Sequence, residues 1–171
     1  MRISRFFSTV LALWLGAAAP GASAQTLAQP ANTVILEVSS ATSAPNSGPI
    51  AQFDLAMLDA LPQRETVTST PWYDGPQTFS GPLLSDLLNT LGVQGTTVRA
   101  VAINDYAVDI PVSDLLDYPV ILASRHNGNL MSVRDKGPLF VVFPFDEVPS
   151  LNNEVYYARS AWQVRHIEVL P

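Results

Sequence analysis

Few side chains in this sequence could carry out catalysis or bind a metal. The chain of 171 residues contains no cysteine and only two histidines, His126 and His166. The absence of cysteine excludes disulfides, zinc–thiolate sites, iron–sulfur clusters and thiol nucleophiles. The two histidines form no H-x-x-H or H-E-x-x-H pattern, so the sequence does not predict a histidine metal site.

Other catalytic patterns are also missing from the sequence. It has no G-x-S-x-G nucleophile elbow and no glycine-rich loop of the kind that binds phosphates or dinucleotides. Pairs such as Asp105 and Asp109 are expected by chance in a chain with 15 acidic residues. They therefore do not indicate catalysis by paired carboxylates. Motifs alone predict a globular domain without an assigned reaction.

The chain is acidic, and its basic residues gather in its last third. The formal net charge is −6, from 9 basic and 15 acidic residues. Nucleic acids and anionic membrane surfaces are thus poor partners, because both are bound through clustered Lys and Arg. The last third of the chain contains five basic residues: Arg125, Arg134, Lys136, Arg159 and Arg165. A site for an anion or an electron-rich ring is expected to use them. The alternative is that they are ordinary solvated charges at strand edges.

Residues 1–24 are predicted to be a secretory signal peptide. Arg2 and Arg5 form a basic region, residues 6–19 an apolar run, and residues 22–24 an A-x-A cleavage site. The apolar run is shorter than the ~20 residues that a spanning helix needs, although an uncleaved anchor is the alternative. The arginines are not adjacent, unlike those of a twin-arginine signal. The mature protein is expected to begin at Gln25 and to be periplasmic.

The rest of the chain is predicted to form one α+β domain made mostly of strands. A chain of about 150 residues buries roughly 68–70% of its unfolded surface, so it needs no metal or disulfide to fold. Asn127 and Gly128 predict a tight hairpin. Strands are expected where β-branched and apolar residues lie between turn signals: residues 33–39, 64–70, 96–103, 106–110, 119–125, 130–133, 139–143 and 161–169.

The clearest predicted helix covers residues 83–91, where five leucines share one face. Pro82 suits its first turn and Gly92 its C-terminal cap. Shorter helices are expected at residues 56–60, capped by Asp54, and at residues 112–117. The predicted fold is therefore α+β, mostly β, with mixed sheets and short helices.

Four stretches, in order along the chain, resemble the molybdopterin-binding domain of the sulfite oxidase family. Residues 72–88 (WYDGPQTFSGPLLSDLL) are similar to the signature W…(W/F)-x-G-x-x-L-x-x-L-L of that family. The others are residues 104–111 (NDYAVDIP), residues 120–144, which contain NGNL and RDKGPL, and residues 162–169 (WQVRHIEV). The resemblance implies a sulfite oxidase-like domain over residues 50–171, preceded by a strand and loop at residues 25–49.

One departure from the family concerns the metal. The resemblance implies a molybdenum-ligating cysteine upstream of Trp72, but residues 67–70 read VTST. A hydroxyl is a poor substitute for a thiolate on this soft metal. The enzymes of the family are loaded in the cytoplasm and exported folded by the twin-arginine route, whereas the signal here is of the general secretory type. The resemblance thus implies a pterin pocket without its molybdenum ligand.

The resemblance also implies which residues would form that pocket. Small periplasmic relatives that lack the cysteine bind free reduced pterins, and some regulate membrane-bound cyclic-di-GMP enzymes. A flat heterocycle with polar edges needs aromatic platforms and hydrogen-bonding groups. The candidates are Trp72, Tyr106 and Trp162 for stacking, Asn104, Asp105 and Asp109 for the amino-pyrimidine edge, and Arg134, Lys136 and Arg159 for further contacts.

Three hypotheses follow. The first is a periplasmic, non-catalytic protein that senses a reduced pterin and signals to a membrane partner. The second is a molybdenum cofactor-dependent oxidoreductase that uses Ser69 or Thr68 as the metal ligand. The third is an interaction module with a vestigial pocket, in which Trp72 and Trp162 serve only as packing residues.

Overall fold

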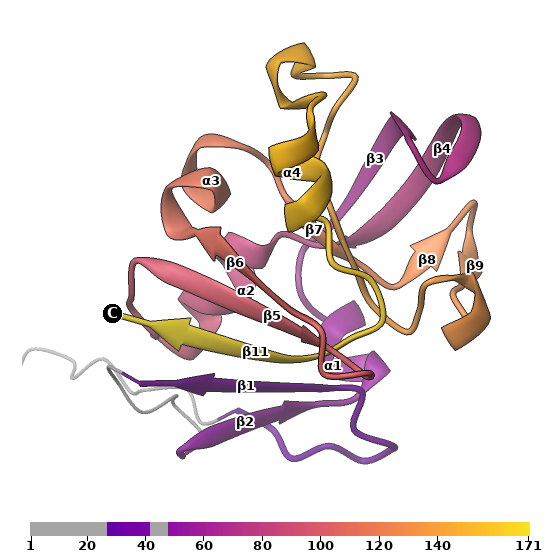
Figure 1. Cartoon of the computed structure of the whole chain (residues 1–171). Coiled ribbons are helices and arrows are strands. Elements are labelled where there is room, and N and C mark those ends of the chain that lie inside the picture. Colours follow the sequence, from indigo (N-terminus) through magenta and orange to yellow (C-terminus); the bar gives the residue numbers. More distant parts are fainter. Residues whose placement is uncertain (1–26, 42–47) are drawn as a thin grey trace, which may run out of the picture.

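Strands from the two ends of the chain pair with each other in the main sheet. The computed structural model describes residues 27–41 and 48–171, so the predicted signal peptide lies outside the described residues. β1 (Leu36–Ser40) runs parallel to β11 (Val164–Leu170), which occupies the centre of the sheet order β2-β1-β11-β5-β6 (Figure 1). The other pairings are antiparallel, and they involve β2 (Ile50–Phe53), β5 (Thr97–Ala102) and β6 (Ala107–Pro111).

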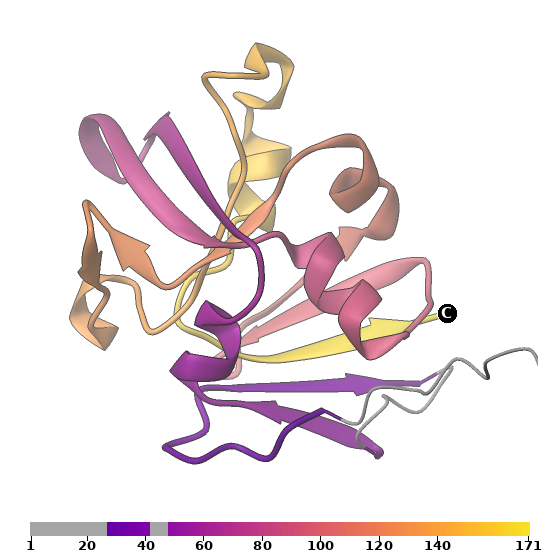
Figure 2. The same ribbon diagram turned by 180° about the vertical axis from the view of Figure 1, so that it is seen from behind.

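A second sheet stands away from the first, and a two-stranded sheet lies between them (Figures 1 and 2). The second sheet is built on an antiparallel hairpin whose two strands pair from Gln63 and Pro82 to Thr70 and Tyr73. Its strands are β3 (Gln63–Thr70), β4 (Tyr73–Pro82), β8 (Arg125–His126) and β9 (Asn129–Leu130). The two-stranded sheet pairs β7 (Ile121–Ala123) with β10 (Phe140–Val142).

The helices of the described residues are short. They are α1 (Leu55–Asp59), α2 (Leu84–Leu91), α3 (Val112–Asp117), α4 (Glu154–Arg159) and the 3-10 turns η1 (Val133–Asp135) and η2 (Pro149–Leu151). Among the described residues, no helix is long and apolar enough to cross a bilayer. The leucine face of α2 is buried, and Gly92 takes the left-handed conformation at its C-terminus, as predicted.

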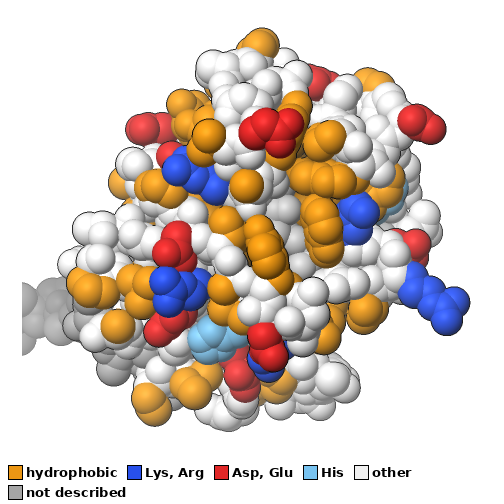
Figure 3. All heavy atoms as spheres, in the orientation of Figure 1, with side chains coloured by type: hydrophobic (Ala, Val, Ile, Leu, Met, Phe, Trp, Pro, Cys, Tyr) orange, Lys and Arg blue, Asp and Glu red, His pale blue; other side chains and the backbone are white. Residues whose placement is uncertain are grey.

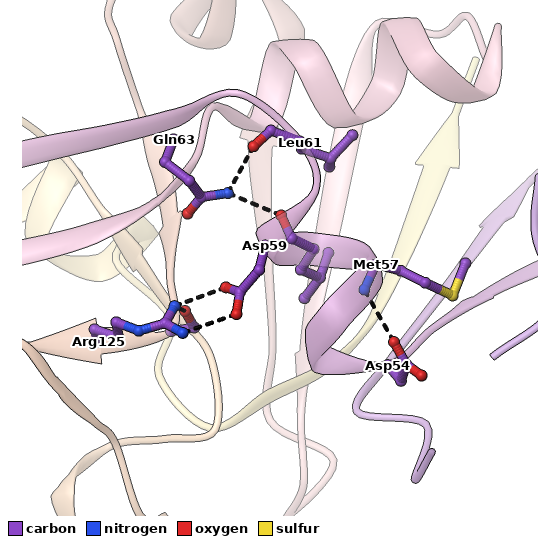
Figure 4. Close-up of polar contacts among 8 residues, drawn as sticks. Asp54, Met57, Asp59, Leu61, Gln63 and Arg125 are labelled. Carbon is purple, nitrogen blue, oxygen red and sulfur yellow. Dashed lines mark hydrogen bonds and ion pairs between the residues drawn. The ribbon is translucent and has the colours of Figure 1, made fainter. Parts of the chain in front are cut away.

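Polar contacts fix α1 to the strands around it (Figure 4). The Asp54 carboxylate caps the helix by accepting a hydrogen bond from the Met57 N–H at 2.9 Å. That bond, helped by the N–H groups of Asn32 and Ala31, holds the pKa of Asp54 below its usual value against the effect of burial. At the other end of the helix, Asp59 forms a two-point ion pair with Arg125 of β8.

The predicted fold class is confirmed: strands outnumber helices among the described residues, and the main sheet is mixed. The Asn127–Gly128 hairpin is also present, with φ angles of 48° and 78° at its two central residues. Both positive angles match the turn type that asparagine and glycine favour.

Three elements were not predicted from the sequence. β4 contains glycines and prolines that lower the strand propensity, yet it pairs with β3 from Gln77 to Pro82 and again at Tyr73. β2 and α4 are short and carry no strong periodicity of their own. In addition, Pro82 belongs to the end of β4 rather than to the first turn of α2, whose N-cap is Leu83.

Candidate functional site

The candidate site is a cavity of about 420 Å³ where three separate segments of the chain meet. One segment is the β3–β4 turn, the second is the end of β5 with the turn to β6, and the third is α4 with the loop that follows it. Figure 3 shows hydrophobic side chains gathered over the middle of this face, below α4. The lining residues are Trp72, Ala102, Asn104, Tyr106, Glu154, Tyr157, Ala158, Ser160, Ala161 and Trp162.

Aromatic rings in edge-to-face contact form one wall of the cavity. The Trp72 ring lies 5.3 Å from the Trp162 ring and 6.1 Å from the Tyr157 ring, with interplanar angles of 75° and 73°. Behind it, Trp72 packs on Phe140, which is fully buried. Such contacts fix the orientation of each ring, because the edge of one aromatic ring is attracted to the face of another. The wall is therefore rigid before any ligand binds.

Lys136 supports the outer part of this wall. Its ammonium group lies 4.9 Å from the centre of the Trp162 ring and 5.3 Å from the centre of the Tyr73 ring. The backbone around it is also held, since the Lys136 carbonyl accepts a hydrogen bond from the Gln163 N–H at 2.9 Å. A cation between two rings attracts both of them. Lys136 thus joins Trp162 to the second sheet.

The polar groups of the cavity come from the β5–β6 turn and from α4. The Asn104 side-chain oxygen accepts a hydrogen bond from the Tyr106 N–H at 3.2 Å, which fixes the turn that presents both residues. Ser160 donates to the Tyr156 carbonyl, and Tyr157 donates to the Asn152 side chain. Glu154 follows the N-cap residue of α4 and contributes an exposed carboxylate. These groups offer hydrogen bonds around an otherwise apolar cavity.

Four of the nine residues singled out from the sequence line the cavity together: Trp72, Asn104, Tyr106 and Trp162. A fifth, Lys136, contacts it through Trp162. Their part in binding a ligand stays a prediction, but the turns that present them converge as the sequence motifs suggested.

The other four candidates are directed elsewhere. Asp105 is 80% exposed and forms an ion pair with Arg165, and Arg159 forms one with the buried Asp114 at 2.6 Å. Arg134 lies exposed in η1 and is not part of the lining. Asp109, also considered for the polar edge, forms an ion pair with Arg99. The family resemblance had placed these side chains in the pocket, whereas Asp105, Asp109 and Arg159 pair with opposite charges on other elements.

Sequence reasoning missed the contribution of α4, which supplies Glu154, Tyr157 and Ala158. A local signal for this helix does exist. Asn153 caps it by accepting a hydrogen bond from the Val155 N–H at 3.0 Å, and Asn is a preferred residue at that position. The acidic residue that follows suits a first helical turn.

A family model described as the oxidoreductase molybdopterin binding domain matches residues 52–169. The chain belongs to this family. The match covers every segment that lines the cavity. A search of the curated proteins found no match.

Among solved structures, this molybdopterin-binding-type domain is similar to the sulfane dehydrogenase SoxCD from Paracoccus pantotrophus. The TM-score is 0.59 at 18% sequence identity, over 79% of this chain and 37% of that chain. At this identity the similarity shows a shared fold. Because the chain spans little more than a third of that protein, the dehydrogenase activity in its name is a property of that protein.

The residues of this family member do not fit a thiolate-bound molybdenum. No cysteine is present, and the described residues contain no group of three His, Cys, Asp or Glu that could hold a metal. The Thr68 hydroxyl is buried and already bonded, since it accepts from the Asp146 N–H at 3.1 Å. Neither Thr68 nor Ser69 lines the cavity. The domain thus offers a place for a flat ring system but no soft ligand for the metal.

Proposed function

We propose that this protein binds a free, reduced pterin in the cavity and does not carry out chemistry at molybdenum. The observation that carries the proposal is the rigid aromatic wall, which stands next to polar groups in a cavity without a thiolate. A cavity of about 420 Å³ lies within the range of roughly 300–1,000 Å³ typical of small-molecule sites. A bicyclic pterin presents two flat faces to such rings and hydrogen-bonding groups around its rim.

The proposal also includes the location of the protein and its partner. We infer that a signal peptide directs it to the periplasm, where ligand occupancy is passed to the periplasmic domain of a membrane protein, such as a cyclic-di-GMP enzyme. Cell fractionation, together with the N-terminal sequence of the mature chain, tests the first part. Co-purification of a membrane protein that depends on added pterin tests the second.

Tryptophan fluorescence gives a direct test of binding. Both tryptophans of the described residues, Trp72 and Trp162, line the cavity, so a ligand stacked there should quench their emission. The probe is 6,7-dimethyl-tetrahydropterin, titrated under anaerobic conditions and checked by calorimetry. We expect saturable binding that Trp72→Ala abolishes and that Val67→Ala, on the exposed face of β3, leaves intact. The proposal fails if no binding is detected with this probe and no pterin is released on denaturing the purified protein.

Family membership favours one other function, a molybdenum-dependent oxidoreductase. Elemental analysis of protein purified from its own periplasm separates the two. Molybdenum at one atom per chain would favour the oxidoreductase, and a pterin without molybdenum would favour the proposal. If instead the cavity is vestigial, Trp72→Ala should leave partner capture unchanged.

A further inference from the structure

The charges around the cavity are distributed unevenly. Among the residues that the structure describes, its lining includes one acidic side chain, the carboxylate of Glu154, and no lysine or arginine. The nearby cations are already engaged with other groups. Arg159 forms an ion pair with Asp114 at 2.6 Å, and Lys136 lies between two aromatic rings.

This arrangement disfavours an anionic ligand. A phosphate group brings one to two negative charges and needs cationic or N–H donors to replace its water. Recruiting Arg159 to bind it would break the Arg159–Asp114 pair and leave the carboxylate of Asp114, only 10% exposed, without its partner. The Glu154 carboxylate would also repel the phosphate directly.

The same carboxylate suits the donor edge of a pterin. The 2-amino group and the adjacent ring N–H of a pterin are neighbouring donors that point the same way, and a carboxylate can accept from both. Glu154 is exposed at the start of α4, and no hydrogen bond or ion pair within the described residues occupies its side chain. It is thus available to a ligand that lies against the aromatic wall.

We propose that the cavity selects an unphosphorylated, uncharged or cationic pterin, and that Glu154 sets this selectivity by accepting hydrogen bonds from the amino-pyrimidine edge. This inference rests on the proposed function, whose ligand class it narrows. It distinguishes the ligand of this protein from molybdopterin, which carries a phosphate.

Two probes with the same pterin ring and side chain test the inference: 7,8-dihydroneopterin and 7,8-dihydroneopterin triphosphate, which adds three negatively charged phosphate groups. Because the phosphates also add bulk, the effects of Glu154→Gln and of salt on the two affinities isolate the contribution of charge. Binding of each is measured by tryptophan quenching at low ionic strength for the wild type and for Glu154→Gln. Glu65→Gln is the matched control, because it makes the same chemical change at an exposed position of β3 outside the cavity.

We expect the wild type to bind dihydroneopterin at least ~10-fold more tightly than the triphosphate. Loss of a charged hydrogen bond should weaken dihydroneopterin binding by about tenfold or more in Glu154→Gln. The ratio of the dissociation constants of the two probes should become smaller in this variant. It should also become smaller at high salt, which screens the repulsion between Glu154 and the phosphates. Glu65→Gln should behave as the wild type does.

Two outcomes would overturn the inference while the proposed function stands: the triphosphate binds as tightly as dihydroneopterin, or Glu154→Gln binds both probes as the wild type does. If neither probe binds the wild type, the proposed function fails with it. Circular dichroism of each variant verifies that the exposed substitutions leave the fold unchanged.

Discussion

Replacing Lys136 with glutamine tests whether the positive charge of this side chain stabilises the aromatic wall of the cavity. The ammonium group lies 5.3 Å from the centre of the Tyr73 ring and 4.9 Å from that of the Trp162 ring. Cation–π contacts at partly exposed sites contribute about 0.5–1 kcal/mol each, so both together give about 1–2 kcal/mol. Glutamine keeps most of the side-chain length and removes the charge. The free energy of unfolding should fall by that amount, which lowers Tm by roughly 2–8 °C in a protein of this size.

Urea unfolding followed by tryptophan emission measures the effect and also reports on the environment of Trp162. Lys136→Arg is the control, because it keeps a cation within reach of both rings and should stay close to the wild type. Lys136 has a φ of 70°, and both variants keep a Cβ, so any backbone strain at this position is the same in all three proteins. An unfolding midpoint for Lys136→Gln equal to that of the wild type would refute the argument that this cation stabilises the wall.

Three further substitutions test the packing and the titration of the second sheet. Thr66→Val should raise the free energy of unfolding by about 1 kcal/mol in urea unfolding, because the buried Thr66 hydroxyl has no hydrogen-bond partner within the described part of the chain. Gly81→Ala should lower it by about 2–3 kcal/mol in the same assay, because a Cβ there would lie 2.1 Å from the Leu122 carbonyl oxygen. Burial lowers the pKa of His126, against the opposing charge of Asp135, so the unfolded chain takes up a proton at a higher pH than the folded protein does. Stability should therefore decrease as the pH falls below about 6.5, and unfolding measured across that range should show a shallower decrease for His126→Gln.

Much of the fold could be predicted because local patterns and tertiary structure agree. The leucine face of α2 and the Asn127–Gly128 turn are each specified within a few residues of sequence. β4 could not be predicted in this way, because its pairing with β3 outweighs the glycines and prolines in it. Helix α4, of only six residues, is too short to be stable alone and depends on the packing of Tyr156 and Tyr157 against neighbouring aromatic rings.

The candidate site contains both residues that the sequence indicated and residues whose partners depend on the whole fold. The family resemblance pointed to the three aromatic residues and Asn104, and the fold does bring them to one cavity. The surroundings of the charged candidates could not be predicted, since an ion pair depends on which distant residue the fold brings near. Asp114 lies on α3 and holds Arg159, far from it in the chain, so the positive charge that the sequence offers is not available in the cavity.

The central position of β11 has a consequence for how the protein folds. β11 lies between β1 and β5 in the main sheet. The β2–β1 pair and the β5–β6 pair therefore cannot join into one sheet until residues 164–170 are in place. Pairing between the two ends of a chain is the slowest kind of contact to form, because the longest loop must close first. A chain in which residues 164–170 have not yet taken their place therefore cannot complete its main sheet.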